Sequence, residues 1–138
     1  MAKEPDNVLA IIPARANSKG LPGKNIRPFC GIPLVRHATL CAGMVPEVSD
    51  IVISSDSRDI LAAAAPDLAE HGYRPRLRPA ELAQDDTPVW AVIRHTLADC
   101  EREMDTVFQY VVLLEPTSPC RKPGWVSEAL ALLKASPH

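Results

Sequence analysis

Basic and flexible residues cluster directly after the first apolar segment of the sequence. Residues 14–27 read ARANSKGLPGKNIR, with two arginines, two lysines, two glycines and two asparagines. Lysine offers phosphate a point charge and arginine a two-pronged donor, while glycine lets backbone N–H groups approach an anion closely. These residue types favour a phosphate-binding loop, and a solvated basic loop is the alternative when the stretch is taken alone.

The position of this loop strengthens the phosphate hypothesis. It contains neither G-x-x-x-x-G-K-[ST] nor G-x-G-x-x-G, so it matches neither of these common phosphate-binding loops. It does follow residues 8–13 (VLAIIP), which are apolar and rich in β-branched side chains. Such a run without polar alternation is typical of a strand that is buried on both faces of a parallel sheet.

Further strands and helices alternate along the rest of the chain. Residues 50–54 and 108–114 predict two more buried strands, and residues 73–78 predict a strand that Pro75 places at a sheet edge. Helices are expected over residues 34–45, 57–71, 88–100 and 125–134, where Thr87 is the expected N-cap of the third and Pro66 should break the second near Ala65. The alternation predicts a Rossmann-like three-layer α/β/α fold with a mostly parallel sheet.

This architecture gathers the chemically interesting residues at one edge of the sheet. In open α/β sheets, ligands bind outside the carboxyl ends of the strands. The loops that follow the predicted strands are residues 14–33, 55–57, 79–87 and 115–123. We therefore expect these four loops to converge on one binding site.

Length and composition exclude several other classes of protein. The 138 residues predict one domain over residues 1–138, and the net charge of −2 argues against binding nucleic acid by bulk charge. No apolar run approaches the ~20 residues of a membrane helix. The four cysteines form no C-x-x-C pair, so free thiols in a reducing cytoplasm are expected.

Four ordered blocks of sequence carry a resemblance to a known family. They are residues 11–25 (IIPARANSKGLPGKN), 54–56 (SSD), 77–88 (LRPAELAQDDTP) and 113–121 (LLEPTSPCR). In this order and spacing they resemble the acylneuraminate cytidylyltransferases, the CMP-sialic acid synthetase group. The related KDO cytidylyltransferases share the Leu-Pro-Gly-Lys segment and fit less well. The resemblance implies a fold of the nucleotide-diphospho-sugar transferase type.

The resemblance also implies a reaction and a set of site residues. Such enzymes activate a nine-carbon 2-keto sugar acid with CTP and Mg²⁺, giving CMP-sugar and pyrophosphate. By resemblance, Arg15 and Lys24 would be catalytic and would share the nucleotide with Ser18, Lys19, Asn25, Arg78 and Thr87. Glu115, Thr117, Ser118 and Arg121 would lie on the sugar side.

Other charged residues and the histidines are expected to have structural and not catalytic roles. Asp85 and Asp86 are expected to shape the nucleotide pocket, and Asp56 to cap the helix that follows it. Arg74 and Arg76 are expected to be solvated residues of an edge strand. None of the histidines is given a catalytic role.

The sequence departs from the family pattern in three places. Relatives usually carry Gln at position 115, where a carboxylate would repel an acidic sugar unless it is protonated or shares a metal. Many relatives have Gly-Gly at Ala16-Asn17. The family chain normally continues well beyond 138 residues, so the sequence predicts a truncated form, with the Mg²⁺ ligands expected mostly in the absent part.

These departures leave three hypotheses open. The chain is a cytidylyltransferase, or a module that binds CTP or CDP without turnover, or a small α/β protein whose truncated sheet edge serves assembly. For the first, the expected partners are CTP and an acidic keto-sugar, in the cytoplasm, with no nucleic acid and no membrane. A homodimer is left open.

Overall fold

The fold is a four-stranded parallel sheet between two layers of helices. The computed structural model describes residues 5–18, 20–65 and 72–136. Strands β1 (Val8–Pro13), β4 (Asp50–Ser55), β5 (Tyr73–Leu77) and β6 (Tyr110–Leu113) are ordered β5-β4-β1-β6, and every neighbouring pair is parallel. The predicted three-layer fold and the edge position of residues 73–78 are confirmed.

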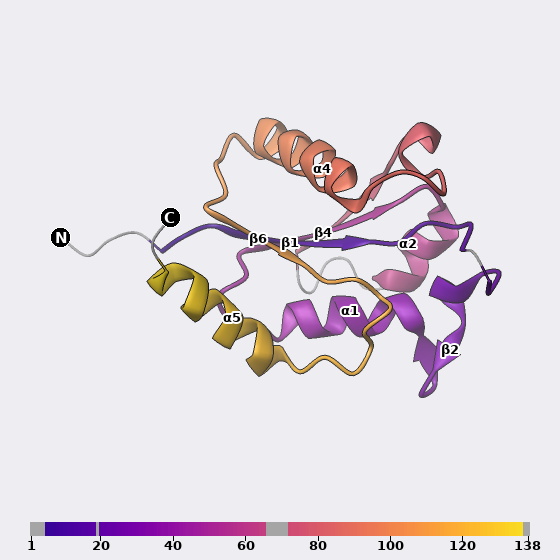
Figure 1. Ribbon diagram of the computed structural model, residues 1–138, viewed down its shortest axis with the longest axis horizontal. Coiled ribbons are helices and arrows are strands. Elements are labelled where there is room, and N and C mark those ends of the chain that lie inside the picture. Colours follow the sequence, from indigo (N-terminus) through magenta and orange to yellow (C-terminus); the bar gives the residue numbers. More distant parts are fainter. Residues whose placement is uncertain (1–4, 19, 66–71, 137–138) are drawn as a thin grey trace.

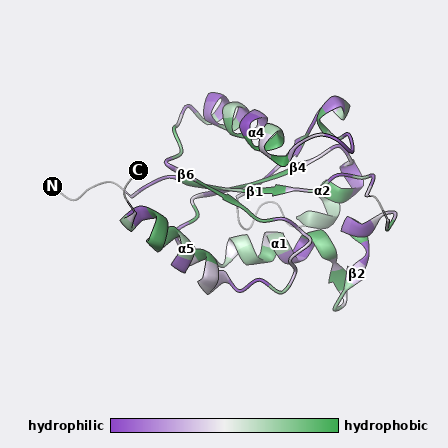
Figure 2. Ribbon diagram, in the orientation of Figure 1, coloured by the Kyte–Doolittle hydropathy of each residue, from purple (hydrophilic) through white to green (hydrophobic). Residues whose placement is uncertain are grey.

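The central strand β1 is buried on both faces because helices cover both. Val8, Ala10 and Ile12 pack with helices α1 (Leu34–Gly43), α2 (Arg58–Ala64) and α5 (Pro123–Ala135). Leu9 and Ile11 pack on the opposite face with α4 (Val89–Met104). Figure 1 shows α4 above the sheet and α1 and α5 below it. Figure 2 shows the apolar character of β1, β4 and β6 between these layers.

Helix α2 ends where the sequence predicts a break. Its last residue is Ala64, two positions before Pro66, which lies outside the described residues, as does His71. The carbonyl of Ala64 accepts hydrogen bonds from Thr39 Oγ1 and Arg36 Nη1 of α1, at 2.5 and 3.1 Å. The backbone acceptor at this helix end is therefore satisfied by a neighbouring helix.

Two sequence predictions about helix starts, in contrast, are wrong. Helix α4 begins at Val89 with Pro88 at the N-cap, and Thr87 makes no capping bond to it. The Thr87 hydroxyl instead accepts from the backbone N–H of Gln84 at 3.1 Å, within its own loop. Helix α2 is capped by Ser57, whose hydroxyl accepts from the N–H of Ile60, and not by Asp56.

A small hairpin in the loop after β1 is not predicted from the sequence. Strands β2 (Pro28–Phe29) and β3 (Ile32–Pro33) pair antiparallel across Cys30 and Gly31, whose φ angles are 50° and 85°. Positive φ at both central residues is the requirement of a type I′ turn. The usual Asn-Gly signal is absent, since Cys30 stands at the first central position. Cysteine rarely occupies this conformation, so the sequence does not indicate the turn.

The two edge strands of the sheet differ in their protection. Strand β5 carries Arg74, Pro75 and Arg76, which are residues that discourage pairing with another chain. Strand β6 reads Tyr-Val-Val-Leu and, within the described residues, pairs only with β1. The assembly hypothesis depends on this apolar edge. No helix in the described part of the chain is long and apolar enough to span a membrane.

Arg76 is not the solvated residue that the sequence predicts. Its side chain is 17% exposed and lies 3.4 Å from Asp99 Oδ2 and 2.5 Å from Glu103 Oε2, both on α4. Arg74 does match the prediction: it is half exposed and its Nε lies 3.8 Å from Asp50. The ion pairs of Arg76 therefore fasten the edge strand β5 to α4.

A close contact between α1 and β5 yields a first prediction. A Cβ atom added at Gly43 would lie 2.8 Å from the hydroxyl of buried Tyr73, which donates to Thr39 O at 2.9 Å. We expect Gly43→Ala to lower the free energy of unfolding by about 1–3 kcal/mol through overpacking. Urea denaturation measures the loss.

Two controls make the result specific. Gly124 of α5 has no atom within 4 Å of an added Cβ, so Gly124→Ala should cost nothing. Removing the tyrosine hydroxyl relieves the contact, so Gly43→Ala should add little in a Tyr73→Phe background. An undiminished loss in that background would contradict the overpacking account.

The ion pairs of Arg76 yield a prediction about pH. Hydrogen bonding to Arg76 lowers the pKa of Glu103 below its ordinary value of 4.5. A lowered pKa contributes stability above the ordinary value, and this contribution is lost as the pH falls through the folded-state pKa. The stability advantage of the wild type over Glu103→Gln should therefore shrink between about pH 6 and about pH 3. Urea titrations at each pH test this, with Glu128→Gln as a control; a constant difference would refute it.

Candidate functional site

A cavity opens at the carboxyl ends of the central strands. It measures about 240 Å³ and is lined by Pro13 and Ala14 at the end of β1 and by Glu115 and Pro116 after β6. The chain first adds β4 and β5 on one side of β1 and then crosses to place β6 on the other. The cavity therefore lies at the point where the strand order reverses, which is where open α/β sheets bind ligands.

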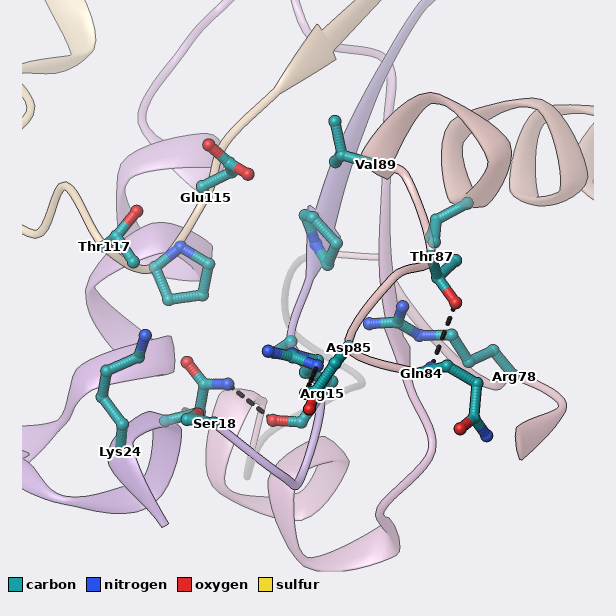
Figure 3. Close-up of a pocket in the computed structure, with 15 residues that line it drawn as sticks. Arg15, Ser18, Lys24, Arg78, Gln84, Asp85, Thr87, Val89, Glu115 and Thr117 are labelled. Carbon is teal, nitrogen blue, oxygen red and sulfur yellow. Dashed lines mark hydrogen bonds and ion pairs between the residues drawn. The ribbon is translucent and has the colours of Figure 1, made fainter. Parts of the chain in front are cut away.

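Most residues predicted for the nucleotide line this cavity together. They come from the loop after β1 and from the loop between β5 and α4, and they are Arg15, Ser18, Lys24, Asn25, Arg78 and Thr87. Lys19, also predicted, lies outside the described residues. Figure 3 shows Lys24 on one side of Arg15, and Arg78 and Thr87 on the other.

The sugar-side prediction divides into two pairs. Glu115 and Thr117 line the cavity, and in Figure 3 they lie on the same side of Arg15 as Lys24. Ser118 and Arg121 do not line it. Arg121 Nη2 instead donates to the backbone carbonyl of Glu115 at 3.4 Å. In this structure Arg121 therefore supports the loop that carries Glu115.

Positive charge exceeds negative charge in the lining. Arg15, Lys24 and Arg78 face Asp85 and Glu115, three cationic side chains against two carboxylates. Arg15 Nη1 lies 2.6 Å from Asp85 Oδ1, so the guanidinium is paired across the cavity with the loop after β5. A phosphate that binds Arg15 must compete with this carboxylate.

Arg78 is a buried side chain in the lining of the cavity. Only 6% of the residue is exposed, and burial lowers the pKa of its guanidinium while the charge of Asp56 opposes that shift. Its Nη1 donates to Leu82 O at 3.0 Å and its Nη2 to Ser54 O at 3.3 Å. These two bonds fasten the loop after β5 to the end of β4. The Nε atom is buried without a hydrogen-bond partner.

Two side chains hold the loop after β1, and the sequence predicts a different role for each of them. Asn25, 5% exposed, donates from Nδ2 to the carbonyl of Arg15 at 2.9 Å. Asp56 accepts from the N–H of Ala16 at 2.8 Å. The expected helix-capping role of Asp56 is thus replaced by a contact with the predicted phosphate loop. Nothing local in the sequence indicates this contact, because it joins residues 40 positions apart.

A second cavity adjoins the first and shares Gln84 and Asp85 with it. It measures about 350 Å³, and its lining includes Asn17, Asp56 and Asp86. Asp85 thus shapes the main cavity as predicted, whereas Asp86 lines only the neighbouring one. Asn17 does not adopt a positive φ. The replacement of glycine there therefore needs no unusual backbone.

Candidate metal ligands are sparse in the described part of the chain. No group of three or more His, Cys, Asp or Glu side chains in the described ranges could hold a metal ion. Mg²⁺ takes one or two carboxylates together with phosphates and water, and of the carboxylates in the main cavity Asp85 is already paired with Arg15. The expected Mg²⁺ therefore stays a prediction.

Comparison with solved structures places the fold in a class. A CMP:2-keto-3-deoxy-manno-octonic acid synthetase complexed with CTP superposes with a TM-score of 0.75 at 19% identity, over 95% of this chain and 48% of that one. A 4-diphosphocytidyl-2C-methyl-D-erythritol synthase from Anaerococcus prevotii gives a TM-score of 0.59 at 14% identity, over 96% and 53%. The fold is that of the nucleotidyltransferases of the CMP-KDO synthetase type.

Sequence comparison then gives the family. The family model described as Cytidylyltransferase matches residues 9–138, so the chain belongs to the cytidylyltransferase family. It is 40% identical over 133 residues to a CMP-N,N′-diacetyllegionaminic acid synthase of Legionella pneumophila, covering 94% of this chain and 54% of that protein. It is 33% identical to an N-acylneuraminate cytidylyltransferase of Escherichia coli, covering 91% of this chain and 28% of that protein. The chain thus spans about half, or less, of the length of these relatives, and the resemblance drawn from its four sequence blocks is confirmed.

The pair between Arg15 and Asp85 yields a prediction about affinity. Asp85→Asn removes the carboxylate that competes with phosphate for Arg15. We expect CTP to bind the variant about two- to fivefold more tightly, which is the scale of a partly exposed ion pair. Isothermal titration calorimetry at low salt measures the change.

Asp86→Asn is the matched control for this prediction. It removes an equal charge from the neighbouring residue, which lines only the second cavity. Its CTP affinity should rise less than that of Asp85→Asn. Weaker CTP binding by Asp85→Asn would show that Asp85 helps to hold the nucleotide, and it would contradict the competition between Asp85 and phosphate for Arg15.

Proposed function

We propose that this chain binds CTP in the main cavity and transfers CMP to a sialic-acid-like 2-keto nonulosonic acid, releasing pyrophosphate. The observation that carries the proposal is the cavity at the strand-order reversal, with its excess of cationic side chains, in a member of the cytidylyltransferase family. The names of the two sequence relatives, a legionaminic acid synthase and an acylneuraminate cytidylyltransferase, support the substrate class.

Arg15 and Lys24 are the residues we assign to the phosphates. Both line the cavity, and both come from the loop that directly follows β1. Their charges would stabilise the negative charge that builds on the phosphate oxygens as the bond to the leaving group breaks. Ser18, from the same loop, adds a hydroxyl donor. In this scheme Arg15 leaves Asp85 when the triphosphate arrives.

The proposed transfer is a single displacement at phosphorus. The oxygen of the anomeric hydroxyl forms a bond to the α-phosphorus, and the bond from that phosphorus to the bridging oxygen breaks. The electron pair of that bond leaves with pyrophosphate, and the hydroxyl proton passes to water. Because charge neutralisation and orientation dominate such reactions, no covalent role is required of the protein.

The sugar side of the proposal rests on Glu115 and Thr117. They line the cavity on the same side of Arg15 as Lys24, with Arg78 and Thr87 on the other side, as Figure 3 shows. We therefore assign cytosine and ribose to the side of Arg78 and Thr87 and the sugar acid to the side of Glu115. Each Arg78 Nη group donates one hydrogen bond to a backbone carbonyl, so three of the five guanidinium N–H groups, among them that of the unpartnered Nε, remain as donors.

The direct test measures pyrophosphate release and CTP binding on the same protein. The chain is incubated with CTP, Mg²⁺ and, in turn, sialic, legionaminic and pseudaminic acids. Release of pyrophosphate with one of these sugars, above a reaction without sugar, supports the transferase. Calorimetric binding of CTP without release identifies a nucleotide-binding module instead. Absence of CTP binding overturns both.

Lys24 provides the sharpest variant for this proposal. Lys24→Ala removes one cationic side chain from the cavity, and we expect CTP binding to weaken by about 1–3 kcal/mol, the scale of a lost charge-assisted contact. Lys122→Ala is the control, because Lys122 lies against Trp125 outside the cavity. Calorimetry compares the two variants at equal ionic strength. Equal affinities would remove Lys24 from the site.

A further inference from the structure

The register between β1 and β4 carries over into the loops that follow them. Pro13 pairs with Ser54, and the N–H of Ala14 donates to Ser54 O at 2.9 Å. Two residues after Ala14 and two residues after Ser54, the N–H of Ala16 donates to the carboxylate of Asp56. The carboxylate of Asp56 is thus brought to the predicted phosphate loop by the pairing of the two strands.

Two side chains hold the same peptide group of that loop. The carbonyl of Arg15 accepts from Asn25 Nδ2 at 2.9 Å, and the N–H of Ala16 donates to Asp56 Oδ1 at 2.8 Å. This carbonyl and this N–H belong to one planar peptide unit, in which they point in opposite directions. The plane between Arg15 and Ala16 is therefore fixed from both sides, and with it the Cα atom from which the Arg15 side chain leaves.

The carboxylate of Asp56 is not required for the helix that begins beside it. Helix α2 begins at Arg58, and the Ser57 hydroxyl supplies the capping bond to the N–H of Ile60. The structure therefore separates two neighbouring roles: Ser57 stabilises α2, and Asp56 orients the loop. This separation makes a matched comparison of the two residues informative.

We propose that Asp56 is a positioning residue that fixes the Arg15–Ala16 peptide and thereby aims Arg15 at the phosphates of the nucleotide. The proposal rests on the proposed function, since it takes CTP as the ligand of the cavity. On the Arg15–Ala16 peptide Asp56 acts through its acceptor oxygen, while its charge acts on the buried Arg78 guanidinium. Its negative charge alone would oppose the binding of a triphosphate.

The central experiment measures CTP affinity by calorimetry for the wild type and four variants. Asp56→Ala removes the acceptor, and we expect CTP to bind about tenfold more weakly. Asp56→Asn keeps an oxygen at the same distance from the backbone and removes the charge, so its affinity should stay within about threefold of the wild type. Asp56→Glu keeps the charge and displaces the oxygen by one methylene, so it should bind as weakly as Asp56→Ala.

Ser57→Ala is the control for lost stability. It removes the cap of α2, which costs a typical helix about 0.5–2 kcal/mol, but it leaves the loop untouched. We expect it to lower the melting temperature and to leave CTP affinity within about twofold of the wild type. If Asp56→Ala does not fold, the comparison between Asp56→Asn and Asp56→Glu decides the matter alone.

A double-mutant cycle tests whether Asp56 acts through Arg15. In an Arg15→Ala background, the further change Asp56→Ala should alter CTP affinity by no more than about twofold, because the side chain to be aimed is gone. An undiminished tenfold effect in that background, or rescue by Asp56→Glu and not by Asp56→Asn, would overturn the proposal. If the wild type itself binds no CTP, the proposed function fails and this inference fails with it. If the wild type binds and all Asp56 variants bind equally, only this inference fails.

Discussion

The site depends on the in-register parallel pairing of β1 with its two neighbours. β1 pairs with β4 from Leu9 to Pro13 and with β6 from Val8 to Ile11. Since parallel strands end on the same edge, three loops are delivered to one place. The pairing is itself stabilised by the burial of β1 on both faces, between α4 and the helices α1, α2 and α5. The polar residues of the cavity are thus positioned in large part by apolar residues, such as Leu9 and Ile11, that do not line it.

A second constraint is that both arginines of the site already make polar contacts within the protein. Arg15 is paired with Asp85, and Arg78 donates to two backbone carbonyls. The backbone of the loop after β1 is held by Asn25 and Asp56. The cationic cavity is therefore largely preorganised by contacts within the protein, and Arg15 is the group whose pairing must change on binding. Preorganised charge is the form in which a protein stabilises a phosphate most effectively.

Much of this could be predicted from the sequence, because the strongest signals are local. The apolar runs at β1 and β4 have no polar alternation, and the basic loop directly follows β1. Together they predict the parallel sheet and the edge at which the cavity opens. What failed were roles set by contacts between distant segments. Arg76 is partly buried against α4 because it forms ion pairs with Asp99 and Glu103 of that helix. Asp56 contacts Ala16 only because β1 and β4 pair in register. The turn at Cys30 and Gly31 also escaped prediction, since cysteine gives no signal for a positive φ.

The central claim is that the loop after β1 receives the phosphates of CTP. A residue-resolved NMR titration of the ¹⁵N-labelled chain tests it most directly, with cytidine as the matched ligand that lacks phosphates. We predict that CTP shifts the backbone amides of residues 14–25 and the Nε–H of Arg15, and that cytidine leaves these signals in place while it shifts those near Arg78 and Thr87. Shifts at residues 14–25 that are equal for both ligands, or CTP-induced shifts confined to other parts of the chain, would contradict the claim.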